Sequence, residues 1–245
     1  MDRALWITWY DLPEAGREDY LAWCHTRYLP DLLRRPGYCW AAHYASVERS
    51  ERPVTAREHG AQRCDDPAVP AGDRFILIVA AGDPVAFGNP SPTALHAGLS
   101  AADRAMLALR AGERMQLSVE ITRVDGPALR SHADGMLPAS CVQVGSYNCP
   151  WQHEEEMHAW YTQWRMAALS RLPGCVRTRR LAGFAGWAKH GVLYEFESLE
   201  MRNEHFLKHE LGNPEMKAWS DRFTRNLTHA PRGSYLARRL WAAAA

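Results

Sequence analysis

The sequence lacks the local signals that mark several large classes of protein. No apolar run approaches the roughly 20 residues that a membrane-spanning helix requires, and no segment has the apolar core of a secretory signal peptide. A glycine-rich phosphate loop and the Gly-x-Ser-x-Gly turn of the α/β-hydrolases are also missing. We therefore expect a cytoplasmic protein that has no membrane partner and uses neither of those two mechanisms.

Cysteine spacing and net charge exclude further classes. The six cysteines include no Cys-x-x-Cys pair and no zinc-finger spacing, which predicts reduced thiols and no metal site. Lys and Arg (29) nearly balance Asp and Glu (28), so no basic surface for nucleic acid is expected. We interpret the basic cluster at 177–180 as solvated strand or loop surface, which is the usual place of charged side chains.

Tryptophan, in contrast, is abundant, with ten in 245 residues. The rest of the composition, 47% hydrophobic and 23% charged, is that of an ordinary globular protein. Large aromatic side chains suit a core, an interface or a pocket for a flat ligand. The tryptophans are therefore expected in the core, at an interface or around a small-molecule ligand.

The two halves of the sequence resemble each other. When 5–45 is aligned with 142–182, a shift of 137 residues, ten of the 41 positions are identical without a gap. Chance would give roughly three identities at the usual abundance of residues. The identities include a shared turn, Pro36-Gly37 and Pro173-Gly174. We interpret this similarity as an internal duplication.

Each half reads as strand, helix, strand, strand, helix, strand. Runs of β-branched and aromatic residues favour strands, and apolar residues at helical spacing favour helices. Strands are expected at about 5–10, 38–48, 74–80, 113–124, 142–147, 175–183, 192–196 and 233–241. The later helices are expected at about 100–111, 199–211 and 215–227. Pro30 should kink or shorten the first helix, whereas its counterpart Ala167 should not.

This order of elements predicts an α+β protein made of two tandem ferredoxin-like (βαββαβ) units. The expected boundaries are unit 1 at 1–125 with a loop insertion at 49–72, a linker at 126–138 and unit 2 at 139–245.

The first strand suggests how the two units combine. Its apolar residues alternate between two faces, with Leu5, Ile7 and Trp9 on one face and Trp6 and Tyr10 on the other. A sheet that is apolar on both faces needs a cover on each of them. We therefore predict that the two sheets pack into a pseudo-symmetric α/β barrel with the helices outside.

Two segments resemble EthD-like proteins of the dimeric α/β-barrel superfamily. The run 23–38 is similar to their helix-and-turn signature, an aromatic pair followed by Glu-His-Leu-Pro and Pro-Gly-Phe, and 192–198 is similar to their third strand. The resemblance implies a barrel that such proteins complete by dimerising and that a tandem chain completes alone, as a monomer or a homodimer. The family's helix histidine falls on Tyr28 in the first half and on Arg165 in the second.

The first half carries the best polar cluster for catalysis, which consists of His25, Tyr28 and His43. A histidine titrates near neutral pH and can act as a general base, while a tyrosine hydroxyl donates a hydrogen bond. The alternative is that both histidines are exposed or merely hydrogen-bonded in the core.

Candidate substrate-binding residues are aromatic side chains and one arginine: Trp6, Tyr10, Trp23, Tyr147, Trp160 and Arg165. An arginine among aromatic rings can hold a carboxylate or a carbonyl. The alternatives are that the two tyrosines fill the core and that Arg165 pairs with the acidic run 154–156 at the rim. We interpret His205 and His209 as an exposed pair, and Glu195 and Glu197 as charges at a sheet edge or pocket mouth.

Three functions remain open at this point, and whether the protein is an enzyme stays undecided. The first is a cofactor-independent oxygenase or isomerase that acts on a small aromatic or polyketide-like molecule. The second is a non-catalytic ligand-binding or assembly module, and the third is haem binding, because the superfamily includes cofactor-free oxygenases, lactone isomerases and haem-degrading enzymes. The first hypothesis requires no cofactor.

Overall fold

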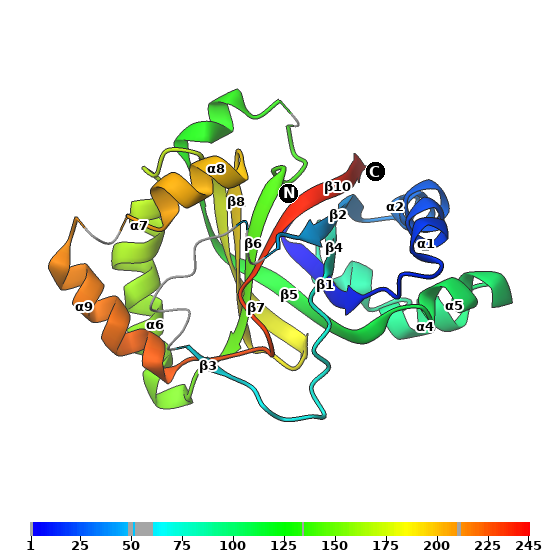
Figure 1. Ribbon diagram of the computed structural model, residues 1–245, viewed down its shortest axis with the longest axis horizontal. Helices are drawn as coiled ribbons and strands as arrows, with labels where there is room; N and C mark the ends of the chain where they lie inside the picture. The colour runs from blue at the N-terminus through cyan, green and yellow to red at the C-terminus, as the bar shows by residue number, and fades with distance from the viewer. Residues whose placement is uncertain (1, 49–50, 52–60, 134, 210–211) are drawn as a thin grey trace.

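A closed antiparallel barrel of eight strands forms the centre of the computed structural model (Figure 1). The structure describes residues 2–48, 51, 61–133, 135–209 and 212–245. The barrel strands are β1 (Ala4–Asp11), β2 (Tyr38–Ser46), β4 (Phe75–Ala81), β5 (Ala111–Asp125), β6 (Cys141–Asn148), β7 (Cys175–Gly186), β8 (His190–Phe196) and β10 (Tyr235–Ala244). The predicted mixed α+β barrel is thereby confirmed.

The strand order is the same in both halves. The first half runs β2–β4–β1–β5 and the second runs β7–β8–β6–β10. In each half the first strand lies between the third and the last. The two halves join where β5 pairs with β7 and where β10 pairs with β2. The last strand of each half therefore pairs with the second strand of the other.

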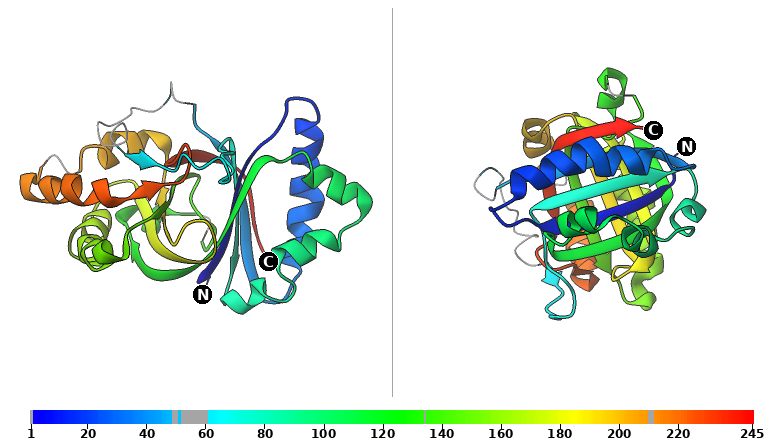
Figure 2. Two further views of the ribbon diagram at one scale, coloured as in Figure 1. Left: turned by 90° about the horizontal axis from the view of Figure 1, so that it is seen from below. Right: turned by 90° about the vertical axis from the view of Figure 1, so that its right-hand side faces the viewer.

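The helices of the two halves lie on opposite sides of the barrel (Figure 2). The first half contributes α1 (Arg17–Trp23), η1 (Cys24–Tyr28), α2 (Leu29–Leu33), η3 (Pro84–Phe87), α4 (Pro92–Ala97) and α5 (Ala101–Leu107). The second contributes η5 (Trp151–His153), α6 (Glu154–Trp160), η6 (Tyr161–Arg165), α7 (Met166–Leu169), α8 (Leu199–Met201), η7 (Arg202–Phe206), α9 (Pro214–Phe223) and η8 (Thr224–Asn226). No helix among the described residues is both long and apolar enough to span a bilayer.

The barrel interior is a packed apolar core to which both halves contribute. Leu5, Ile7 and Trp9 point inward and share one cluster with Val144 and Leu193 of the second half. Trp6 and Tyr10 instead pack beneath the helices of the first half. The predicted division of the first strand into two apolar faces is confirmed, and each sheet covers the inner face of the other.

One wide helical turn recurs in both halves. The π-helical segments Cys24–Tyr28 and Tyr161–Arg165 are separated by the same 137 residues as the sequence repeat. Pro30 follows the first of them, but Ala167 follows the second, so the irregularity does not require a proline. The expectation that only the first helix would be irregular is wrong.

Several boundaries differ from the predictions. The helix expected at about 100–111 is only Ala101–Leu107, because β5 begins at Ala111, and α4 and the 3-10 segment η4 (Pro127–Ser131) were not predicted. The helix expected at about 199–211 has helical structure over 199–206. Of the insertion at 49–72, residues 49–50 and 52–60 lie outside the described residues. Its later part contains β3 (Gln62–Arg63), which pairs with β9 (Thr228–His229).

The basic cluster at 177–180 is buried and not solvated as predicted. Arg179 lies inside the closed barrel, where its guanidinium donates to Asp2 (2.6 Å) and to Glu195 (3.1 Å). Burial alone would raise the pKa of Asp2, but Arg179, Arg123 and Trp40 hold it well below its usual range. Glu195 is likewise fully buried and not an edge charge. Inward positions of a closed barrel have no exit to solvent, so opposite charges must compensate each other there.

Candidate functional site

In the first half, two of the three predicted catalytic residues meet. His25 of η1 lies 2.8 Å from His43 of β2, measured between Nε2 and Nδ1. The Nε2 atom of His43 lies 2.7 Å from the hydroxyl of Tyr10, which in turn accepts a hydrogen bond from Tyr20. Tyr28 is not part of this chain, because its hydroxyl pairs with His96 of α4 at 2.7 Å.

The space between helix and sheet in the first half is filled by Arg110. Its guanidinium lies 4.7 Å from the centre of the Tyr10 ring, 5.7 Å from Tyr20 and 5.4 Å from Tyr28. It donates to the Tyr20 hydroxyl at 2.6 Å and to Glu113 at 2.7 Å. The aromatic faces and the two oxygen acceptors compensate most of this buried charge, although Nη2 of Arg110 has no hydrogen-bond partner among the described residues.

The cavity described in the first half therefore lies elsewhere. It has a volume of about 300 Å³ and lies between the helix α1–α2 and the pair α4–α5. Trp23 and Tyr28 line it, and the indole of Trp23 donates to Asp103 at 2.8 Å. Neither His25 nor His43 lines this cavity.

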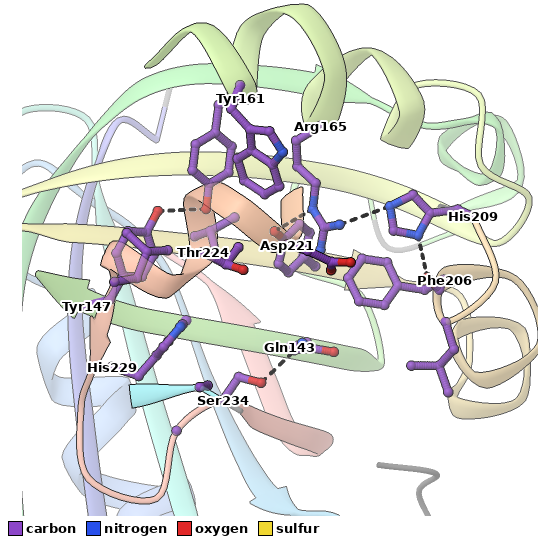
Figure 3. Close-up of a pocket in the computed structure, with 18 of the residues that line it drawn as sticks. Gln143, Tyr147, Tyr161, Arg165, Phe206, His209, Asp221, Thr224, His229 and Ser234 are labelled. Carbon is purple, nitrogen blue, oxygen red and sulfur yellow. Dashed lines mark hydrogen bonds between the residues drawn. The ribbon is translucent and has the colours of Figure 1, made fainter. Parts of the chain in front are cut away.

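The second half contains a larger cavity of about 540 Å³ (Figure 3). Its lining comes from β3, β6, α6, η6, β8, η7, α9, η8, β9 and the loops next to them. Three of the predicted substrate-binding residues line it: Tyr147, Trp160 and Arg165. The other three, Trp6, Tyr10 and Trp23, belong to the first half, where Trp6 and Tyr10 are fully buried core residues.

Arg165 is a firmly held cation of this cavity. It is buried, and its guanidinium lies 5.4 Å from the Trp160 ring, 5.3 Å from Tyr194 and 4.9 Å from Phe206. It bonds the Tyr194 hydroxyl at 3.1 Å and Nε2 of His209 at 2.9 Å. These partners fix the planar group in one orientation.

Two tyrosine hydroxyls meet at another part of the wall. Tyr147 donates to Tyr161 at 2.6 Å (Figure 3). Burial raises the pKa of both phenols well above the ordinary value, so both stay protonated at physiological pH. The guanidinium of Arg180 lies 4.8 Å from the Tyr161 ring. Because the proton of Tyr147 is donated to Tyr161, the hydroxyl of Tyr161 is the one whose proton is available to a ligand.

Two histidines line the cavity and differ in how they are held. His209 pairs through Nε2 with Arg165 and through Nδ1 with the carbonyl of Phe206. It is therefore not the exposed member of a pair that its spacing from His205 suggested. Burial and then Arg63 lower the pKa of His229 to about 4, so its ring is neutral at physiological pH. The Nδ1 atom of His229 has no hydrogen-bond partner among the described residues.

The lining is positively charged. It contains five cationic side chains and a single carboxylate, namely Arg63, Arg165, Arg202, Lys217 and Arg225 with Asp221. These come from five separate segments, so no local run in the sequence signals them, and the net charge of +1 for the whole chain conceals the local excess. A polarised cavity of this kind attracts ligands that carry or develop negative charge.

No family model matches the sequence, and no curated protein matches it either. Solved structures do match over nearly the whole chain. An anthrone oxidase-like protein has a TM-score of 0.62 at 9% identity and covers 100% of this chain and 94% of its own. A provisionally assigned monooxygenase from Lactobacillus acidophilus has a TM-score of 0.57 at 10% identity. The match covers 100% of this chain and 97% of the monooxygenase chain.

A provisionally assigned chlorite dismutase also matches, with a TM-score of 0.50 at 12% identity and coverage of 98% and 96%. The chain shares its α+β barrel fold with these proteins. Identities of this size show the fold alone, so the activity must be argued from the site.

Haem was one of the three open functions, and the cavity limits how it could bind. An axial imidazole must offer a free ring nitrogen. His209 uses both of its nitrogens in hydrogen bonds, and Nδ1 of His229 is buried. Nε2 of His229 is the remaining imidazole nitrogen of the described lining that could face a metal.

Proposed function

We propose that the second-half cavity binds a small, flat, hydroxylated aromatic molecule and that the protein oxidises it without a cofactor. The caged guanidinium of Arg165 beside the hydroxyl pair of Tyr147 and Tyr161 is the observation that carries this proposal. Aromatic walls provide stacking surface for a flat ring system. A fixed cation and phenolic donors stabilise negative charge as it develops on a substrate oxygen.

The chemistry follows from that charge stabilisation. A ring methylene flanked by aromatic or carbonyl groups loses a proton to a base such as the neutral His229, and the electron-rich enolate that remains reacts with O₂. One methylene and one O₂ give one carbonyl and one water, so no further oxidant is needed.

We also infer that the barrel arose by duplication of one ferredoxin-like unit of EthD-like kind. The equal strand order of the two halves, the ten sequence identities and the recurring π-helical turn support this history. A barrel that closes within one chain makes the monomer sufficient for the site, and a homodimer remains compatible with it.

Oxygen consumption with an anthrone as the probe tests the activity. Wild-type protein should consume one O₂ per anthrone, and Arg165→Met should lower kcat/KM roughly 100-fold, the size typical of losing a charge-stabilising group. Arg34→Ala, an exposed arginine of the first half, is the matched control and should leave the rate unchanged.

Three outcomes contradict the assignment. If Arg165→Met keeps full activity while His43→Gln or Tyr28→Phe loses it, the site lies in the first half, where the sequence placed it. If the anthrone neither binds nor reacts, the aromatic substrate class is wrong. If the purified protein shows a Soret band that His229→Ala abolishes, the cavity holds haem.

A further inference from the structure

We propose that Cys24, His25 and His43 of the first half form a binding site for a soft monovalent metal ion, copper(I). This site is separate from the second-half cavity and does not depend on its function. The thiol sulfur and one nitrogen of each imidazole all lie within 4.8 Å of one another. A thiolate with two imidazoles is a donor set typical of copper and zinc.

The geometry needs only small adjustments to hold an ion. Metal–nitrogen bonds of about 2.0 Å and a metal–sulfur bond of about 2.3 Å require roughly 3.3 Å between the two nitrogens. The facing nitrogens of His25 and His43 are 2.8 Å apart, so they must separate by about half an ångström. Their mutual hydrogen bond would be replaced by two metal bonds.

The surroundings orient one ligand and give access to another. The hydroxyl of Tyr10 occupies Nε2 of His43, which leaves Nδ1 directed at the site. Such second-shell contacts fix the tautomer and the orientation of metal-bound imidazoles. His25 is half-buried, so an ion can reach it from solvent, and its ring stacks against Trp241 at an interplanar angle of 4°.

Charge selects the ion. Arg110 lies close to this site: its guanidinium is 4.7 Å from the centre of the Tyr10 ring, and the Tyr10 hydroxyl bonds His43. A copper(I) thiolate is neutral, whereas a zinc(II) thiolate brings a net positive charge into a buried region that already holds a guanidinium. Because uncompensated buried charge is costly, copper(I) is favoured over zinc(II).

The second half has the same backbone but no such ligands. Position 161 is Tyr, position 162 is Thr and position 180 is Arg, each 137 residues after a proposed ligand. The fold therefore does not require a thiol and two imidazoles at these places. Their presence in one half alone is what a site acquired after duplication predicts.

An anaerobic titration tests the proposal. Copper(I) would be delivered from a coloured chelator to a Cys39→Ser/Cys64→Ser/Cys149→Ser background, which removes the partly exposed thiols. One equivalent should bind, and Cys24→Ser or His43→Gln should weaken binding at least tenfold. Cys175→Ser, a buried thiol of the second half, is the matched control and should bind like the background.

X-ray absorption of the copper-loaded background protein keeps the test independent of whether any variant folds. A first shell of one sulfur and two nitrogens is expected. Failure to take up one equivalent, a shell without sulfur, or unchanged affinity in the folded His25→Gln variant would overturn the site. Stronger binding of zinc(II) than of copper(I) would overturn the choice of ion.

Discussion

The two halves share a scaffold but use the space between helix and sheet in opposite ways. In the first half Arg110 fills that space and is surrounded by three tyrosine rings. In the second half Arg165 is also surrounded by three aromatic rings, but it lies at the wall of a 540 Å³ cavity. The two arginines come from different elements: Arg110 precedes β5, whereas Arg165 ends η6.

This difference is what the proposed duplication and the proposed site together predict. The position of Arg165 corresponds to Tyr28 in the first half, and each bonds a histidine of the following helical region, His209 and His96 respectively. The two halves therefore have a contact at the same place between their helical regions, made with different side chains. Under the proposed function, the first half supports the fold and the second binds the ligand.

The largest expected effect concerns the barrel that joins the halves. Arg179→Met should lower the free energy of unfolding by about 3–5 kcal/mol, because it leaves the carboxylates of Asp2 and Glu195 buried without their shared partner. Urea denaturation measures the change. The exposed Arg171→Met is the control, for which about 0.5 kcal/mol or less is expected. A loss of that small size for Arg179→Met would show that the barrel charges do not couple the halves.

Replacing Arg110 and Arg165 one at a time should show which of them contributes to ligand binding as well as to stability. Arg110→Met should cost roughly 2–3 kcal/mol of stability, since Tyr20 and Glu113 lose a charged donor, and should leave aromatic binding in the second half intact. Arg165→Met should also cost stability, since Tyr194 and His209 lose a charged donor, but it alone should weaken aromatic binding, by roughly 100-fold. Denaturation and tryptophan fluorescence titration measure the two effects. Equal effects of both changes on binding would contradict the division of tasks.

Acid should destabilise both halves through one histidine each. Burial is the main reason that the pKa values of His96 and His229 fall to about 4. A lowered histidine pKa favours the neutral form, so this stability is complete above pH 6.5 and declines as the pH falls toward 4. Each histidine should account for roughly 2 kcal/mol between pH 7 and 4.5. The free energy of unfolding should depend less steeply on pH in His96→Gln and in His229→Gln than in the wild type. An unchanged pH dependence in either variant would show that the imidazole it replaces lies in solvent.

The smallest effects should come from Tyr10 and Tyr147, which occupy equivalent positions in the two halves. Tyr10→Phe should cost about 1–2 kcal/mol of stability, because His43 and Tyr20 lose a buried partner. Tyr147→Phe should instead weaken ligand binding by about tenfold, the size of one hydrogen bond. Denaturation and fluorescence titration distinguish the two variants. If Tyr147→Phe lowers stability but leaves ligand binding unchanged, Tyr147 is not part of the proposed site.

Sequence patterns predicted the barrel because its signals are local. Alternating apolar residues placed Leu5, Ile7 and Trp9 on one face, and the repeat supplied the second sheet to cover them. The same patterns did not predict the buried charges. Arg179 looked like surface because a charged residue usually lies there, and only closure of the barrel removes that option.

The location of the cavity could not be predicted for a related reason. Tyr147, Trp160 and Arg165 were identified from their types, but whether space remains beside them depends on distant segments. In the first half Arg110 closes the equivalent space from a loop that carries no motif. In the second, α9 and β9 complete the wall from residues about 60 positions further along the chain.

The pairing of β10 has a consequence for how the protein is made. This strand hydrogen-bonds to β2 on one side and to β6 on the other. On the ribosome, the first half can form its sheet early, but its β2 edge has no partner until residues near 244 have emerged. We therefore expect nascent chains that lack β10 to expose two unpaired strand edges, a state prone to association. The ring closes only when the final strand is inserted, so synthesis order and barrel closure are coupled.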